Sequence, residues 1–98
     1  MFPETRVTPN ELRDKFNRNE GGYPGRIDSL RRVQIYSRPA APHSRQPRGT
    51  RSVMYKYFDG NLPVMWLHCM RLRDGSLGGS GKMDPKRLLV DGVYYYCS

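Results

Sequence analysis

One stretch of the sequence decides the fold: Arg51-Ser-Val-Met-Tyr-Lys-Tyr-Phe58, then Asp59-Gly60-Asn61-Leu62, then Pro63-Val-Met-Trp-Leu-His-Cys-Met-Arg-Leu-Arg73. The first run is rich in β-branched and aromatic residues, and the last run contains the only tryptophan of the chain. Asp59-Gly60 is the kind of dipeptide that supplies positive φ angles in a hairpin turn. We therefore predict a β-hairpin at the core of the protein.

Alternation along the second predicted strand assigns its side chains to two faces of a sheet. The even-numbered side chains share one face, which we predict to be buried: Val64, Trp66, His68, Met70 and Leu72. On this interpretation His68 is a core histidine. We also expect Trp66 and the run Tyr94-Tyr-Tyr96 to supply much of the core, because large aromatic side chains bury the most apolar surface.

A helix is predicted near the N-terminus from the capping box Thr8-Pro9-Asn10-Glu11. The threonine hydroxyl accepts a hydrogen bond from a free amide, and proline suits the first helical position, where an N–H is not needed. Leu12 and Phe16, four residues apart, would face the core. The run at residues 19–22 ends the helix.

The sequence signals for the remaining elements are weaker. A short strand is expected at residues 32–36 and a last strand at residues 93–97. Asp84 as cap and Pro85 in the first helical position predict one short helical turn. The predicted fold class is therefore α+β, an N-terminal helix packed on a small antiparallel sheet of three to four strands with a long basic loop.

The length of 98 residues suits a single small α+β domain that covers residues 1–98. Two loops interrupt it. Residues 37–50 form a basic Pro/Arg-rich loop with almost nothing to bury, and residues 74–82 form a Gly-rich loop. A loop as long as the first is usually functional or disordered in so small a domain.

The net charge of +8 is distributed unevenly. Residues 1–25 hold four acids and four bases, residues 26–58 hold one acid and eight bases, and residues 59–98 hold four acids and five bases. A field concentrated in this way attracts polyanions, either nucleic acid or an acidic protein face. Salt weakens such an interaction.

The two cysteines, Cys69 and Cys97, are too few for a disulfide framework. Both fall in predicted strands, so a bridge is possible if those strands are neighbours, but we favour free thiols in a reducing cytosol. Together with His43 and His68 they lack the paired spacing of zinc ligands. Because no apolar run has the length of a signal peptide or a membrane span, we expect a cytoplasmic protein with no membrane partner.

No motif in the sequence specifies a reaction, and no catalytic residue, metal or cofactor is predicted. The stretch Gly75-Ser-Leu-Gly-Gly-Ser-Gly-Lys82 does not match a phosphate-binding P-loop, because Ser76 and Met83 occupy positions that need a glycine and a hydroxyl residue. Two interpretations stay open. The loop is either a flexible connection or an anion-binding nest of backbone amides with Lys82 beside it.

The strongest functional signal is a series of arginines between residues 26 and 51. The planar guanidinium suits bidentate contact with phosphate or carboxylate and stacking on bases. Tyr55 and Tyr57 share a face of their strand, where they offer a stacking platform or pack in the core. The predicted binding residues are Arg31, Arg32, Arg38, His43, Arg45, Arg48, Arg51, Lys56, Tyr55 and Lys82.

Two functions from different classes fit these features. The first is a small protein that binds the phosphates of DNA or RNA with little sequence preference, with Arg45, Arg48 and Arg51 as the main contacts. The second is a phage- or mobile-element-type inhibitor or adaptor that docks on an acidic surface of a larger nucleic-acid-handling protein. An enzyme is the weakest interpretation, because acid–base catalysis needs a pair of groups held in geometry. We expect a monomer, or a homodimer formed through an exposed sheet edge.

Overall fold

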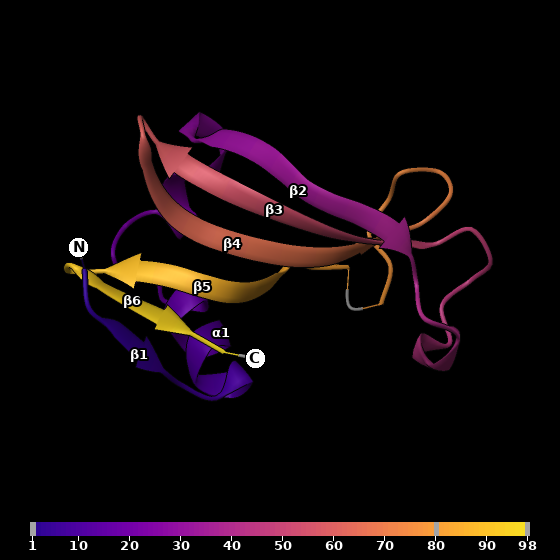
Figure 1. Ribbon diagram of the computed structural model, residues 1–98, viewed down its shortest axis with the longest axis horizontal. Helices are drawn as coiled ribbons and strands as arrows, with labels where there is room; N and C mark the ends of the chain where they lie inside the picture. The colour runs from indigo at the N-terminus through magenta and orange to yellow at the C-terminus, as the bar shows by residue number, and fades with distance from the viewer. Residues whose placement is uncertain (1, 80, 98) are drawn as a thin grey trace.

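A mixed β-sheet forms the body of the protein in the computed structural model, which describes residues 2–79 and 81–97 (Figure 1). Within these residues the sheet has six strands in the order β1-β6-β5-β4-β3-β2, so that β1 and β2 are its edges. In chain order the strands are β1 (Glu4–Arg6), β2 (Arg31–Pro39), β3 (Arg51–Asp59), β4 (Leu62–Arg71), β5 (Asp84–Val90) and β6 (Val93–Tyr96). The pair β1 and β6 is parallel, and the other neighbouring pairs are antiparallel.

This architecture contradicts the predicted fold class. The expected α+β fold, an N-terminal helix on three to four antiparallel strands, is wrong because the described chain builds six strands, one of which pairs in parallel. The unexpected strand β1 has three residues, all exposed, and so carries no alternation that a sequence pattern could reveal. Strands take up far more of the described chain than helices do, and the described residues contain one α-helix.

The segment that contains Pro85 is a strand, and the predicted helical turn there is wrong. Leu67 lies opposite Pro85 while Trp66 lies opposite Arg87, so Lys86 is an extra residue in β5. This is a β-bulge, a position where a proline is tolerated because the ladder hydrogen bonds are already interrupted. The bulge therefore allows a proline in an inner strand of the sheet.

The central hairpin is confirmed. β3 and β4 pair antiparallel from Arg51 opposite Arg71 to Asp59 opposite Leu62. Gly60 occupies the turn with a φ angle of 61°, the positive value that the Asp-Gly dipeptide predicts. The last predicted strand is also confirmed, as β6. These elements have strong local signals, which explains why they are readable from the sequence.

A bulge in β4 shifts the alternation of its side chains. Tyr57 lies opposite Met65 and Phe58 lies opposite Pro63, so Val64 is the extra residue. Val64 and Met65 are consecutive and both buried, with exposed fractions of 0% and 1%. An alternation that starts from Val64 therefore assigns every later side chain of the strand to the wrong face.

Past this bulge the buried side chains of β4 are the odd-numbered ones, Met65, Leu67 and Cys69. Trp66 and His68 point to the opposite face and are partly exposed. The prediction that His68 and Trp66 face the core is therefore wrong. Of the tyrosine run, Tyr94 and Tyr95 are partly buried and pack against the core cluster.

The N-terminal helix α1 (Pro9–Asn17) begins as predicted. Thr8 Oγ1 accepts a hydrogen bond from the Glu11 amide at 3.1 Å, and Pro9 occupies the first turn. Leu12 is fully buried, and the helix packs against β5. Figure 1 shows α1 behind β5 and β6, so it covers one face of the sheet. No helix in the described residues is both long and apolar enough to cross a membrane.

Two further segments cover the same face as α1. The 3-10 helix η1 (Pro24–Ser29) contributes Ile27, and residues 72–83 contribute Leu77 and Met83 to the core cluster. We call this side of the sheet the covered face. The other side, which we call the open face, follows from the strand register and carries Glu4, Arg6, Arg31, Val33, Tyr36, Arg38, Ser52, Met54, Lys56, Phe58, Pro63, Trp66, His68, Met70, Asp84, Arg87, Leu89, Tyr94 and Tyr96.

Both predicted loops extend from the same end of the sheet (Figure 1). The basic loop is shorter than expected, because β2 continues to Pro39 and takes the first residues of the 37–50 segment. It includes the 3-10 helix η2 (Pro42–Ser44), and Thr50 closes it by donating to the Pro47 carbonyl at 2.6 Å. In the glycine-rich loop, Ser80 lies outside the described residues.

Candidate functional site

Cations and aromatic rings alternate across the open face of the sheet. The guanidinium carbon of Arg31 lies 4.4 Å from the ring centroid of Phe58. The ammonium of Lys56 lies 5.5 Å from the same centroid and 5.0 Å from that of Trp66. Distances below about 6 Å are those of attractive cation–π contacts. Arg31 and Lys56 thus connect β2, β3 and β4 through aromatic rings.

Arg87 continues this arrangement onto the far strands. Its guanidinium carbon lies 4.9 Å from the ring centroid of Trp66, 4.9 Å from that of Tyr94 and 5.6 Å from that of Tyr96. Arg87 also forms an ion pair with Glu4 of β1. We call the whole set the cation–aromatic row: Arg31, Phe58, Lys56, Trp66, Arg87, Tyr94 and Tyr96.

The strand register accounts for the row. Lys56 lies opposite Trp66, and Trp66 lies opposite Arg87 on the next strand. Directly opposed side chains on one face are close enough to interact, with Cβ atoms about 5 Å apart. The row is therefore a property of how five strands align, and its members are scattered along the sequence.

Most of the positive charge on the open face has no acidic partner. Among the described residues Arg31, Arg38 and Lys56 form no ion pair with a carboxylate, whereas Arg87 has Glu4. A guanidinium stacked on a ring keeps the N–H groups at its edge available to an anion. These cations are held in place by rings and retain hydrogen-bonding capacity.

A second group of polar side chains surrounds His68, beside the row. His68 Nε2 and Ser52 Oγ are 2.6 Å apart. Burial lowers the pKa of His68, the charges of Lys86 and Arg38 lower it further, and Asp84 opposes them. The imidazole is therefore mostly neutral at pH 7.

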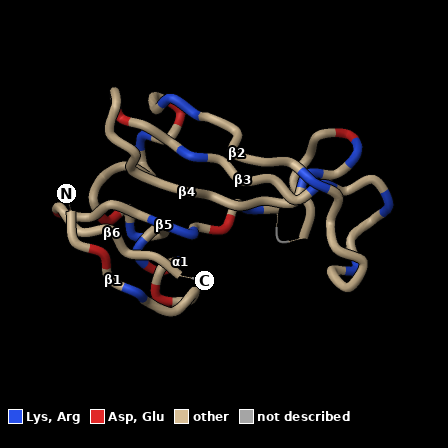
Figure 2. Tube along the Cα trace, in the orientation of Figure 1, with Lys and Arg blue, Asp and Glu red and all other residues tan. Residues whose placement is uncertain are grey.

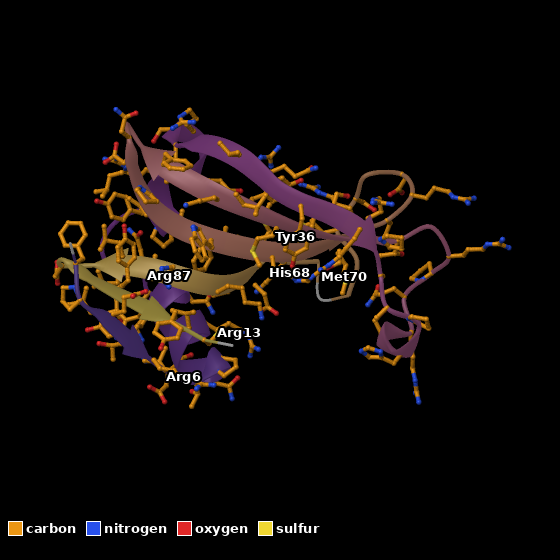
Figure 3. All side chains as sticks on the ribbon, in the orientation of Figure 1. Arg6, Arg13, Tyr36, His68, Met70 and Arg87 are labelled. Atoms are coloured by element: carbon orange, nitrogen blue, oxygen red, sulfur yellow. The ribbon has the colours of Figure 1, made fainter. Side chains whose placement is uncertain are left out.

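Figure 3 shows Tyr36, His68 and Met70 on the same part of the sheet, with Arg87 farther along. Arg38 stacks on Tyr36 with its guanidinium carbon 4.2 Å from the ring centroid. This pair has the same character as those of the row. The open face thus presents stacked cations both along the row and next to His68.

The structure separates the predicted binding residues into three places. Arg31, Arg38 and Lys56 lie on the open face. Arg32 and Tyr55 lie on the covered face, where Arg32 stacks on the Tyr55 ring at 4.3 Å. Because Tyr55 is 7% exposed, it packs in the core and offers no stacking platform. Tyr57 is 3% exposed and therefore also packs in the core, where burial raises the pKa of its hydroxyl.

The other predicted residues lie at the loop end of the sheet. His43, Arg45 and Arg48 are exposed in residues 40–50, and Figure 2 shows basic residues in both loops beyond the sheet. Arg51 starts β3 and donates to the Ser37 hydroxyl at 2.7 Å and to the Ser37 carbonyl at 2.8 Å. Lys82 is exposed in the glycine-rich loop. These residues and the cation–aromatic row occupy different parts of the molecule.

In the described part of the glycine-rich loop, three glycine amides donate to carbonyls within the loop or next to it. Backbone hydrogen bonds run from Gly75 to Leu72, from Gly78 to Met70 and from Gly81 to Gly78. The Asp74 carboxylate accepts from the Ser76 amide and hydroxyl, and these bonds lower its pKa. An ionised carboxylate in the loop repels an anion, so we assign no anion site to it.

The cysteines are buried free thiols. Cys69 lies on β4 and Cys97 follows β6, and β5 runs between those strands, so the condition for a bridge is not met. Burial raises the pKa of the Cys69 thiol, which disfavours the reactive thiolate at neutral pH. Within residues 2–79 and 81–97 no three side chains of His, Cys, Asp or Glu gather to hold a metal ion.

Comparison of the chain with protein-family models, curated proteins and solved structures finds no match. The function must therefore be argued from the site and its chemistry.

Proposed function

We propose that the protein binds single-stranded nucleic acid, with little sequence preference, on the open face of its sheet. The observation that supports this is the cation–aromatic row. Proteins that bind single strands combine positive charge for the phosphates with aromatic rings on which bases stack. The row supplies both, since its cations alternate with rings from β2 to β6.

The width of the row favours single strands over duplexes. It runs from β2 to β6, across four inter-strand spacings of about 4.8 Å, and so extends about 19 Å. The major groove of a duplex is about 12 Å wide and admits a helix or a two-stranded ribbon. Base edges in a duplex cannot reach such a row, whereas unpaired bases can lie on it.

Stacking also prepares the cations for binding. An arginine held against a ring has fewer side-chain rotamers to lose when it meets a phosphate, which improves affinity. Arg31 and Arg87 are held in this way. In this proposal the exposed Arg45 and Arg48 add long-range attraction from the loop end, a contribution that falls with salt.

The test is a fluorescence-anisotropy titration of labelled oligodeoxythymidine, oligouridine and a duplex, at about 50 mM and about 200 mM salt. The variant Arg31→Ala/Lys56→Ala removes two cations of the row. The control Lys15→Ala/Arg18→Ala removes the same charge from α1 and its C-cap, on the covered face, where both side chains pair with Glu20.

We expect tight binding to the single strands and weaker binding to the duplex. The row variant should weaken binding and lower the slope of log affinity against log salt by roughly 0.7 for each lost phosphate contact. The control should keep the slope of the wild type. Equal losses in both variants would contradict the proposed face. If no nucleic acid binds to the folded protein, the proposal fails. The row would then fit the interface with an acidic protein, because arginine and aromatic side chains dominate such interfaces.

A further inference from the structure

Polar side chains from three strands meet around His68 on the open face. Ser52 of β3 contacts His68 directly, with 2.6 Å between Oγ and Nε2. Arg38 of β2 lies opposite Ser52 in the ladder. The bulge in β5 adds Lys86, whose charge acts on His68 as that of Arg38 does. The imidazole thus contacts one hydroxyl, and the charges of two cations from other strands act on it.

This arrangement suits an anion with several oxygens. With His68 in the tautomer whose Nε2–H donates to Ser52 Oγ, the Ser52 hydroxyl can donate to an oxyanion. The Arg38 guanidinium and the Lys86 ammonium can donate to the same anion from two other strands. A tetrahedral phosphate offers acceptors in all these directions, whereas a planar carboxylate offers two oxygens in one plane. Arg38 is positioned by stacking on Tyr36 at 4.2 Å.

We propose that Ser52, His68, Arg38 and Lys86 form a binding site for one phosphate group. The proposal rests on the proposed function, because the nucleic acid supplies the phosphate, either as an internal phosphodiester or as a terminal phosphomonoester. A bound phosphate compensates the two cations, so His68 takes up a proton and becomes a further donor.

The charges that act on His68 come from the strands on either side of β4. Arg38 from β2 and Lys86 from β5 disfavour its protonation, and Asp84 from β5 favours it. The Asp84 carboxylate accepts from Arg13 Nε at 3.1 Å, which offsets part of its negative charge toward a phosphate. Asp84 lies directly opposite His68 in the ladder, but the two cations outnumber this one carboxylate, so the net charge around His68 is positive.

The experiment follows the Cε1–H resonances of both histidines by NMR across a pH series. His68→Gln assigns the two signals, and His43, exposed in the basic loop, is the internal reference. The probes are sodium phosphate alone, and oligodeoxythymidine with a 5′-phosphate, with a 3′-phosphate or with neither. Anisotropy measures the affinity of the same oligonucleotides for wild type, His68→Gln and the control His43→Gln.

We expect saturating oligonucleotide to move the His68 signal and to raise the pKa that it reports, while His43 changes little. His68→Gln should bind about tenfold more weakly, as loss of one hydrogen bond to a charged group implies. A response that needs one terminal phosphate identifies the phosphomonoester as the ligand. A response that all three oligonucleotides share identifies the internal phosphodiester.

Bound oligonucleotide with no change in the His68 signal and no loss in His68→Gln would overturn this site, and the open face would still stand as the nucleic-acid surface. If no oligonucleotide binds, the proposed function fails, and the titration with sodium phosphate decides the site separately. A saturable shift of the His68 signal supports a phosphate site, and no shift refutes it.

Discussion

Replacing Trp66 by leucine removes the ring at the middle of the cation–aromatic row. The variant loses cation–π contacts with Lys56 at 5.0 Å and Arg87 at 4.9 Å. Each such contact contributes about 0.5–1 kcal/mol at a partly exposed site, so the free energy of unfolding should fall by about 1–2 kcal/mol. The free energy of unfolding of folded proteins is about 5–15 kcal/mol, so the variant should remain folded.

The loss in binding should be larger than the loss in stability. Stacking of one base on an aromatic ring is worth about 1–3 kcal/mol, which corresponds to about 5- to 150-fold in affinity. Because Trp66 is the only tryptophan, its fluorescence reports directly on the row. We expect oligodeoxythymidine to quench this fluorescence with the same midpoint as the anisotropy titration.

A matched control lies on the covered face. Tyr95 carries Lys15 over its ring at 4.3 Å, so Tyr95→Leu also removes a cation–π contact but leaves the open face intact. It should keep the affinity of the wild type once its folding is verified by circular dichroism. Two results together would refute stacking of bases on the row: the wild type binds the oligonucleotide without any change in Trp66 emission, and Trp66→Leu binds it with the affinity of the wild type.

Two further predictions concern stability. Leu88→Ala should lower the free energy of unfolding in urea by about 2–5 kcal/mol, because Leu88 is fully buried, whereas Leu62→Ala at the partly exposed turn should cost less. Equal losses would contradict the assigned core. The stability of the wild type should fall as the pH drops from the ordinary histidine value of 6.5 through the lowered pKa of His68, because the unfolded chain then binds the proton more readily. His68→Gln should lack this component when urea midpoints are compared across the pH series, and an identical profile would speak against it.

The parts of the fold that sequence predicts are those with local signals. The hairpin follows from Asp59-Gly60 between two β-rich runs, and α1 follows from its capping box at Thr8. The sequence predicts a helical turn where β5 lies, because Asp84-Pro85 is also a helix-start signal and only pairing with β4 distinguishes a strand from a helix here. β1 has no local signal, since its partner lies at the other end of the chain.

The sequence predicts the basic residues of the candidate site but not the aromatic rings that they contact. Arg31 and Lys56 are visible in the sequence as basic residues. The Phe58 ring in contact with Arg31 and the Trp66 ring in contact with Lys56 lie on neighbouring strands, so only the strand register reveals these pairs. Trp66 was assigned to the core because the bulge at Val64 shifted the alternation. One feature of the sequence does indicate which face of β4 is buried. The odd-numbered Met65, Leu67 and Cys69 are uniformly apolar, while the even-numbered set includes a histidine.

The parallel pair β1 and β6 brings together segments from opposite ends of the sequence, with Glu4 beside Tyr94 and Arg6 beside Tyr96. Closing so long a loop costs more chain entropy than forming the hairpins between β2 and β4, so we expect this pair to form late in folding. Until then the edge of β6 is unpaired, and Glu4 is not beside Arg87. The cation–aromatic row lies on β2 to β6 and forms without β1, so the late strand adds the Glu4 carboxylate to Arg87 after the row is complete and lowers the net positive charge of the open face.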